Sequence, residues 1–81
     1  MNRFRILLFA RYAELLGAEE VAVELPDQAT VATLIDALRA LPGGVLLPAR
    51  PVVARNLGVA RIDDVLDPAD ELALLPPLAG G

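Results

Sequence analysis

Residues 30–44, TVATLIDALRALPGG, carry the clearest helix pattern of the chain and set the strongest condition on its fold. Thr30 is a natural N-cap, and Pro42 with Gly43 ends the pattern. Apolar residues recur at helical spacing on one side: Val31, Leu34, Ile35, Leu38 and Leu41. A helix with one apolar stripe buries it against another layer, so the remaining segments have to supply a sheet or a second helix.

The segments on both sides of this helix have strand patterns. Residues 3–10 form a short apolar run, residues 19–26 alternate apolar and polar side chains, and residues 11–17 suit one or two helical turns ended by Gly17. After the helix, residues 52–56, 57–62 and 71–76 are predicted strands, with a turn around Asn56 and Gly58. This order predicts one α+β domain, a mixed sheet of four to five strands with one main helix packed on one face.

Strand alternation separates a core face from an outer face. The inward positions of the first and last strands are apolar: Phe4, Ile6, Leu8, Leu72 and Leu74. The outward positions include Phe9 and Leu75, and Val59 of the preceding strand joins them in a predicted exposed apolar patch.

The residue inventory excludes most kinds of catalytic site. The 81 residues contain no cysteine, histidine, serine or lysine, so a thiolate metal site, an imidazole base and a serine nucleophile are all impossible. No cofactor-binding or metal-binding residues are predicted; Asp63, Asp64 and Asp67 suit a solvated turn with side-chain hydrogen bonds better than a calcium loop. The net charge of −4 argues against a nucleic-acid partner. Without a run of about 20 apolar residues or a signal-peptide pattern, we expect no membrane partner and a cytoplasmic location.

The last residues, LLPPLAGG, point to a different kind of chemistry. Pro76 and Pro77 fix φ and favour an extended chain, while Gly80 and Gly81 leave the backbone almost bare of side chains. Such an end can thread a narrow channel of another protein, and an acyl group on Gly81 is unhindered. We therefore expect a domain over residues 1–76 and an extended Gly-Gly tail over residues 77–81.

The tail and its flanking segments resemble one known family. The stretches VARNLGVARIDDVLDPADELALLPPLAGG (53–81) and LLFARYAELLGAEEVAVELP (7–26) are similar to the small subunit of molybdopterin synthase, a sulfur carrier with the ubiquitin-like β-grasp fold. Pro-Pro-x-x-Gly-Gly is the specific part of this resemblance. Three positions depart from the family pattern: Ala13, where an arginine is common, and Leu74 and Leu75, where aromatic residues are common.

The resemblance implies a non-catalytic subunit that carries sulfur for molybdenum cofactor biosynthesis. An E1-like adenylyltransferase uses ATP to adenylate Gly81, and a sulfur donor protein converts the adenylate to a thiocarboxylate. The large catalytic subunit, in a heterotetramer with this chain, then uses that sulfur on a pyranopterin precursor. The residues implied in partner binding are Phe9, Val59, Leu75, Pro76, Pro77, Leu78 and Ala79, with Gly80 and Gly81 at the reacting end.

Two other functions remain open at this point. A sulfur carrier for thiamine thiazole synthesis also ends in Gly-Gly, although such chains are usually shorter and lack the Pro-Pro. A ubiquitin-like binding module whose tail is never activated would also fit the fold and the missing catalytic side chains.

Overall fold

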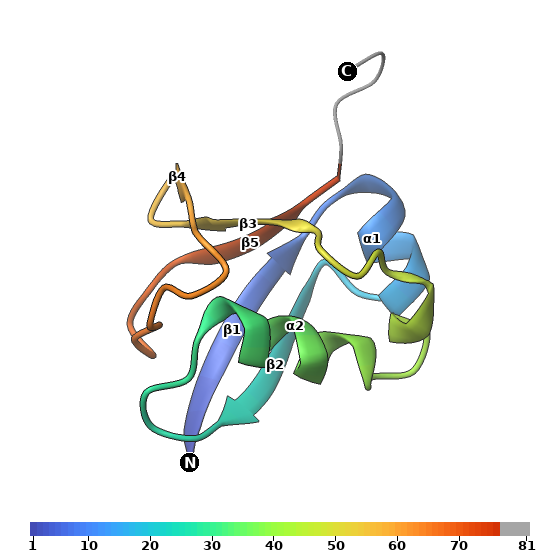
Figure 1. The fold of residues 1–81 in the computed structure, drawn as a ribbon. Coiled ribbons are helices and arrows are strands. Elements are labelled where there is room, and N and C mark those ends of the chain that lie inside the picture. Colours follow the sequence, from blue (N-terminus) through green and yellow to red (C-terminus); the bar gives the residue numbers. More distant parts are fainter. Residues whose placement is uncertain (77–81) are drawn as a thin grey trace.

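A computed structural model describes residues 1–76 and shows a mixed sheet crossed on one face by a helix (Figure 1). The elements, in chain order, are β1 (Asn2–Leu8), α1 (Ala10–Leu16), β2 (Glu20–Leu25), α2 (Val31–Arg39), η1 (Gly44–Leu46), β3 (Val52–Arg55), β4 (Gly58–Val59) and β5 (Leu72–Leu75). The strands lie in the order β2-β1-β5-β3-β4. The central pair, β1 and β5, is parallel, and the other pairs are antiparallel. The predicted α+β architecture is confirmed, with five strands in the described chain.

The helix α2 forms where its cap and its stripe predicted. The Thr30 hydroxyl accepts a hydrogen bond from the Thr33 amide, and the Thr33 hydroxyl accepts one from the Thr30 amide, which together make a capping box. Regular helix ends at Arg39, and Ala40 caps it with helical dihedral angles; Pro42 disfavours a helical conformation at Leu41, so the helix cannot extend further. Four of the five stripe residues are buried, namely Val31, Leu34, Ile35 and Leu38, while Leu41 is half-buried against the core.

The core lies between α2 and the sheet. The inward residues of β1 and β5 are Phe4, Ile6, Leu8, Leu72 and Leu74, and all five are at most 3% exposed, as the alternation predicted. They form one cluster with the α2 stripe. Among residues 1–76 every buried side chain is aliphatic or aromatic, and the one buried side-chain nitrogen or oxygen without a hydrogen-bond partner is Nε of the half-buried Arg39. No helix in this part of the chain is long and apolar enough to cross a membrane.

Of the two shorter elements, one confirms its prediction and the other differs from it. The reversal between β1 and β2 is the helix α1, which ends at Gly17 in the left-handed conformation (φ 71°), as its sequence indicated. The predicted strand over residues 57–62 shortens to β4, because the chain leaves the sheet after Ala60 and turns toward the start of α2. There the carbonyls of Ile62 and Asp64 accept hydrogen bonds from the first amides of α2, both at 3.1 Å. The end of the predicted strand therefore lies against the helix start, where its Ile62 carbonyl satisfies an α2 amide that has no partner within the helix.

Candidate functional site

The face of the sheet opposite α2 carries a row of apolar side chains. Leu7 of β1 lies opposite Ala73 of β5, Ala73 lies opposite Ala54 of β3, and Ala54 lies opposite Val59 of β4. Directly opposed residues in neighbouring strands project from the same face. The sheet register thus gathers small and apolar residues from four strands into one outer surface.

A hollow of about 250 Å³ opens on this outer face. Leu7, Ala54 and Ala73 come from the three adjacent strands β1, β3 and β5 and form its floor, because Ala residues in the middle leave space there. The remaining lining residues are Phe9, Leu57, Glu71 and Leu75. We call this surface, with its seven lining residues, the outer-face hollow.

The structure brings two of the three predicted patch residues together. Phe9 is 47% exposed and lines the hollow, where Leu75 of β5 also lies, half-buried. Val59 is 75% exposed but does not line the hollow, since it sits one strand further out in β4. Pro76 directly follows β5 and is half-buried. The other predicted tail residues lie outside the described residues: Pro77, Leu78, Ala79, Gly80 and Gly81.

The turn between β3 and β4 contributes a lining residue that the sequence interpretation missed. The hairpin loop has two residues, Asn56 and Leu57, with positive φ values of 51° and 73°. Both positive values are typical of the primed turns that fit the twist of paired strands. Gly58, which the sequence indicated as a turn residue, is instead the first residue of β4. The spacing of a two-residue loop would have placed Leu57 in the turn.

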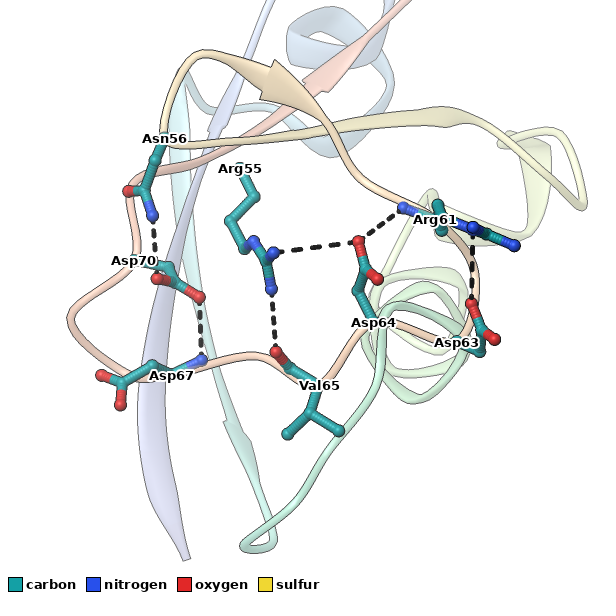
Figure 2. Close-up of polar contacts among 8 residues, drawn as sticks. All are labelled: Arg55, Asn56, Arg61, Asp63, Asp64, Val65, Asp67 and Asp70. Atoms are coloured by element: carbon teal, nitrogen blue, oxygen red, sulfur yellow. Dashed lines mark hydrogen bonds and ion pairs between the residues drawn. The ribbon is translucent and has the colours of Figure 1, made fainter.

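Asn56 holds the end of β3 against the start of β5. Its backbone amide donates to the Glu71 carbonyl at 2.8 Å, and its side-chain Oδ1 accepts from the Glu71 backbone amide at 2.9 Å. Its Nδ2 donates to Asp70 Oδ1 at 3.0 Å, and Asp70 Oδ2 in turn accepts from the Asp67 amide at 2.8 Å (Figure 2). This network fixes the backbone on which Leu57 and Glu71 reach the hollow.

The acidic turn is organised by hydrogen bonds and ion pairs of its own. Asp64 Oδ2 accepts from the Arg61 amide at 2.9 Å and lies 3.9 Å from the Arg55 guanidinium, whose Nη1 donates to the Val65 carbonyl (Figure 2). Asp67 Oδ1 accepts from the Ala69 amide at 2.8 Å, the side-chain turn expected for this residue type. Among residues 1–76, no cluster of three or more carboxylates is arranged to hold a metal ion.

The sequence profile of the ThiS family matches residues 6–81, which is nearly the whole chain. The chain belongs to the ThiS family. Among proteins similar to this ThiS-family chain, the molybdopterin synthase sulfur carrier subunit of Dictyostelium discoideum is 31% identical over 84 residues, covering 99% of this chain and 98% of that protein. Small archaeal modifier protein 1 of Haloferax volcanii is 37% identical over 83 residues, covering 91% and 95%.

Solved structures give the same fold for this ThiS-family chain. The crystal structure of the Haloferax volcanii protein superimposes with a TM-score of 0.82 at 31% identity, covering 99% of this chain and all of that one. A putative molybdopterin converting factor subunit of Pyrococcus furiosus, at 23% identity and a TM-score of 0.81, agrees in fold. The ubiquitin-like β-grasp fold and the resemblance to molybdopterin synthase sulfur carriers are therefore confirmed.

Proposed function

We propose that this chain is the sulfur carrier of molybdopterin synthase and that Gly81 is its reacting residue. The observation that carries the proposal is the match over nearly the whole chain to carriers of that name, from Dictyostelium discoideum and Arabidopsis thaliana among others. The chain also fits a carrier because its sequence has no histidine, cysteine, serine or lysine to act as a base or nucleophile, and Tyr12 lies packed in the apolar core.

The proposed chemistry takes place on the main chain. A carboxylate is a poor electrophile, so an E1-like adenylyltransferase first joins the Gly81 carboxylate to AMP from ATP and releases pyrophosphate. Sulfide, free or released by a sulfur donor protein, then attacks the acyl carbon, displaces AMP and leaves a thiocarboxylate. The large synthase subunit receives this end and passes its sulfur to the pyranopterin precursor. The carrier itself binds neither ATP nor metal in this scheme.

The outer-face hollow supplies the proposed docking surface for these larger proteins. It lies beside Leu75 and Pro76, the point from which residues 77–81 continue. Phe9 at 47% exposure presents an aromatic ring there, and aromatic residues are enriched at the centres of protein interfaces. Docking at this place would bring the partner's active site within reach of the proposed tail.

A second candidate function is supported by the 37% identity to small archaeal modifier protein 1. In this alternative the activated Gly81 carboxyl group is joined to an amine of another protein instead of receiving sulfur. Both functions need adenylation, so they separate only at the second step.

Intact-mass measurement tests the proposal. The purified chain is incubated with ATP, the adenylyltransferase and sulfide, and we expect the mass change of sulfur replacing oxygen, located at Gly81 by fragmentation. A variant lacking Gly81 should keep the circular dichroism spectrum and gain no sulfur, whereas Glu19→Gln, an exposed change in the loop before β2, should be charged like the wild type. A wild-type chain that gains no sulfur would overturn the proposal, and one that instead forms amide-linked conjugates in a cell extract would favour the modifier function.

A further inference from the structure

Leu57 occupies a backbone position that its own side chain disfavours. Its φ of 73° lies in the left-handed region, which costs free energy for a residue with a Cβ, and glycine is preferred at this place in a two-residue hairpin turn. The side chain is 92% exposed, so it gains almost nothing from the core. Neither backbone preference nor packing within residues 1–76 accounts for a leucine here.

Positive φ values outside glycine gather around the outer-face hollow. Residues 1–76 contain four of them, at Ala10, Gln28, Asn56 and Leu57. Ala10 directly follows Phe9, and Asn56 and Leu57 form the turn between β3 and β4. Three of the four residues therefore belong to the two turns that place Phe9 and Leu57 at the hollow. Backbone of this kind is concentrated at functional sites in proteins.

Glu71 brings one charge to this apolar surface. Its carboxylate is exposed at the hollow, and within the described residues it takes part in no hydrogen bond and no ion pair. The backbone of the same residue is bonded twice to Asn56, which precedes Leu57. One residue, Asn56, therefore fixes the positions of both the exposed leucine and the unpaired carboxylate.

The size and charge of the hollow indicate what fills it. The hollow has a volume of about 250 Å³, and all but one of its lining residues are apolar, so it offers few of the convergent polar groups that orient a small molecule. An apolar side chain of another protein suits its floor of Leu7, Ala54 and Ala73. Covering the hollow would strip water from Glu71, which is costly unless a cation pairs with it.

We propose that Leu57 and Glu71 are specificity-determining residues for docking, and that the larger partner places an apolar side chain in the hollow against Leu57 and a lysine or arginine beside Glu71. This inference rests on the proposed function, because it takes the large synthase subunit as the partner. It adds two residues, from the β3–β4 turn and the start of β5, to the patch predicted from Phe9 and Leu75. Because Glu71 is the one charged residue that lines the hollow, we expect the partner surface at this point to be basic.

Leu57→Gly separates docking from folding. The substitution removes the strained side chain, so the melting temperature should equal or exceed that of the wild type, while affinity for the large subunit should fall by about tenfold. Gln28→Gly is the matched control, since it relieves a φ of 65° at an exposed site that does not line the hollow. It should leave affinity unchanged. Unchanged affinity in Leu57→Gly, or a lowered melting temperature, would overturn the role of Leu57.

Glu71→Gln tests the charge without disturbing the backbone bonds to Asn56. We expect affinity for the large subunit to fall by about fivefold at low salt, and the dependence of affinity on salt concentration to become shallower. Asp36→Asn, an exposed change on α2 across the sheet, should alter neither quantity. Equal salt dependence in Glu71→Gln and the wild type would show that no cation of the partner faces Glu71.

The two proposals fail in different ways. If the wild type gains sulfur at Gly81 and binds the large subunit, but both variants bind equally well, this inference is wrong and the sulfur-carrier function stands. If the wild type is never charged, the proposed function fails by the mass measurement. If the wild type is charged but does not bind the large subunit, the occupant named here is wrong.

Discussion

Asn56 and Glu71 are joined by two hydrogen bonds, one in each direction, although they lie 15 positions apart in the chain. The Asn56 backbone amide donates to the Glu71 carbonyl, and the Glu71 backbone amide donates to the side-chain Oδ1 of Asn56. The two residues directly follow and precede the paired positions Arg55 and Leu72 of β3 and β5. A side-chain amide thus continues the sheet ladder at the point where β3 turns away into its hairpin.

Asn56→Ala should destabilise the domain by about 2–3 kcal/mol, because it removes two side-chain hydrogen bonds and places an alanine at a φ of 51°. Urea unfolding followed by circular dichroism measures this free energy. Asn56→Gly keeps the freedom of φ and loses the same bonds, so it should cost about 1 kcal/mol less. Equal losses in the two variants would show that the backbone conformation contributes nothing.

Phe9→Glu should keep the fold and weaken binding to the large subunit by about tenfold or more. Phe9 is the N-cap residue of α1, where a negative charge is favourable, and nearly half of its surface is exposed. Calorimetric titration measures the affinity. Val45→Glu is the control, since Val45 is 71% exposed on η1, away from the hollow, and its affinity should match the wild type. Equal affinity in Phe9→Glu and Val45→Glu would reject the docking surface.

Gly44→Ala should prevent stable folding or cost several kcal/mol. A Cβ at Gly44 would come within 2.1 Å of the Leu38 carbonyl oxygen and 2.9 Å of Arg39 backbone atoms, which cannot move without disturbing α2. Gly58→Ala is the matched control, because its nearest atom is 3.8 Å away, and its melting temperature should stay close to the wild-type value. Similar melting temperatures for the two alanine variants would contradict the close approach of η1 to α2.

Thr30→Ala should lower the free energy of unfolding by about 1 kcal/mol through loss of the α2 cap. Thr33→Ala should cost less, because alanine has the higher helix propensity and offsets part of the lost capping bond. Thermal unfolding of both variants measures the difference. A larger loss in Thr33→Ala than in Thr30→Ala would contradict the assignment of Thr30 as the N-cap.

The sequence predicted the elements whose patterns are local. The stripe of α2 follows the 3.6-residue period, and the alternation of Phe4, Ile6 and Leu8 follows the two-residue period of a strand. The length of β4 could not be predicted in this way. A strand was predicted over residues 57–62, but the carbonyls of Ile62 and Asp64 accept hydrogen bonds from α2 amides about 30 residues earlier, and that pairing depends on where α2 lies.

Part of the candidate site could likewise be predicted from local sequence patterns, and part depended on tertiary contacts. By itself the sequence determined that the chain lacks the side chains for most catalysis, that Phe9 and Leu75 face outward, and that a Gly-Gly end with two prolines resembles a sulfur carrier's tail. Only the tertiary structure decided that Leu57 and Glu71 join them, because the hollow exists through the register of β1, β5 and β3 and through the Asn56 bonds. Side-chain periodicity depends on residues that are neighbours in the sequence, whereas strand register depends on which distant strands pair and how their buried faces pack.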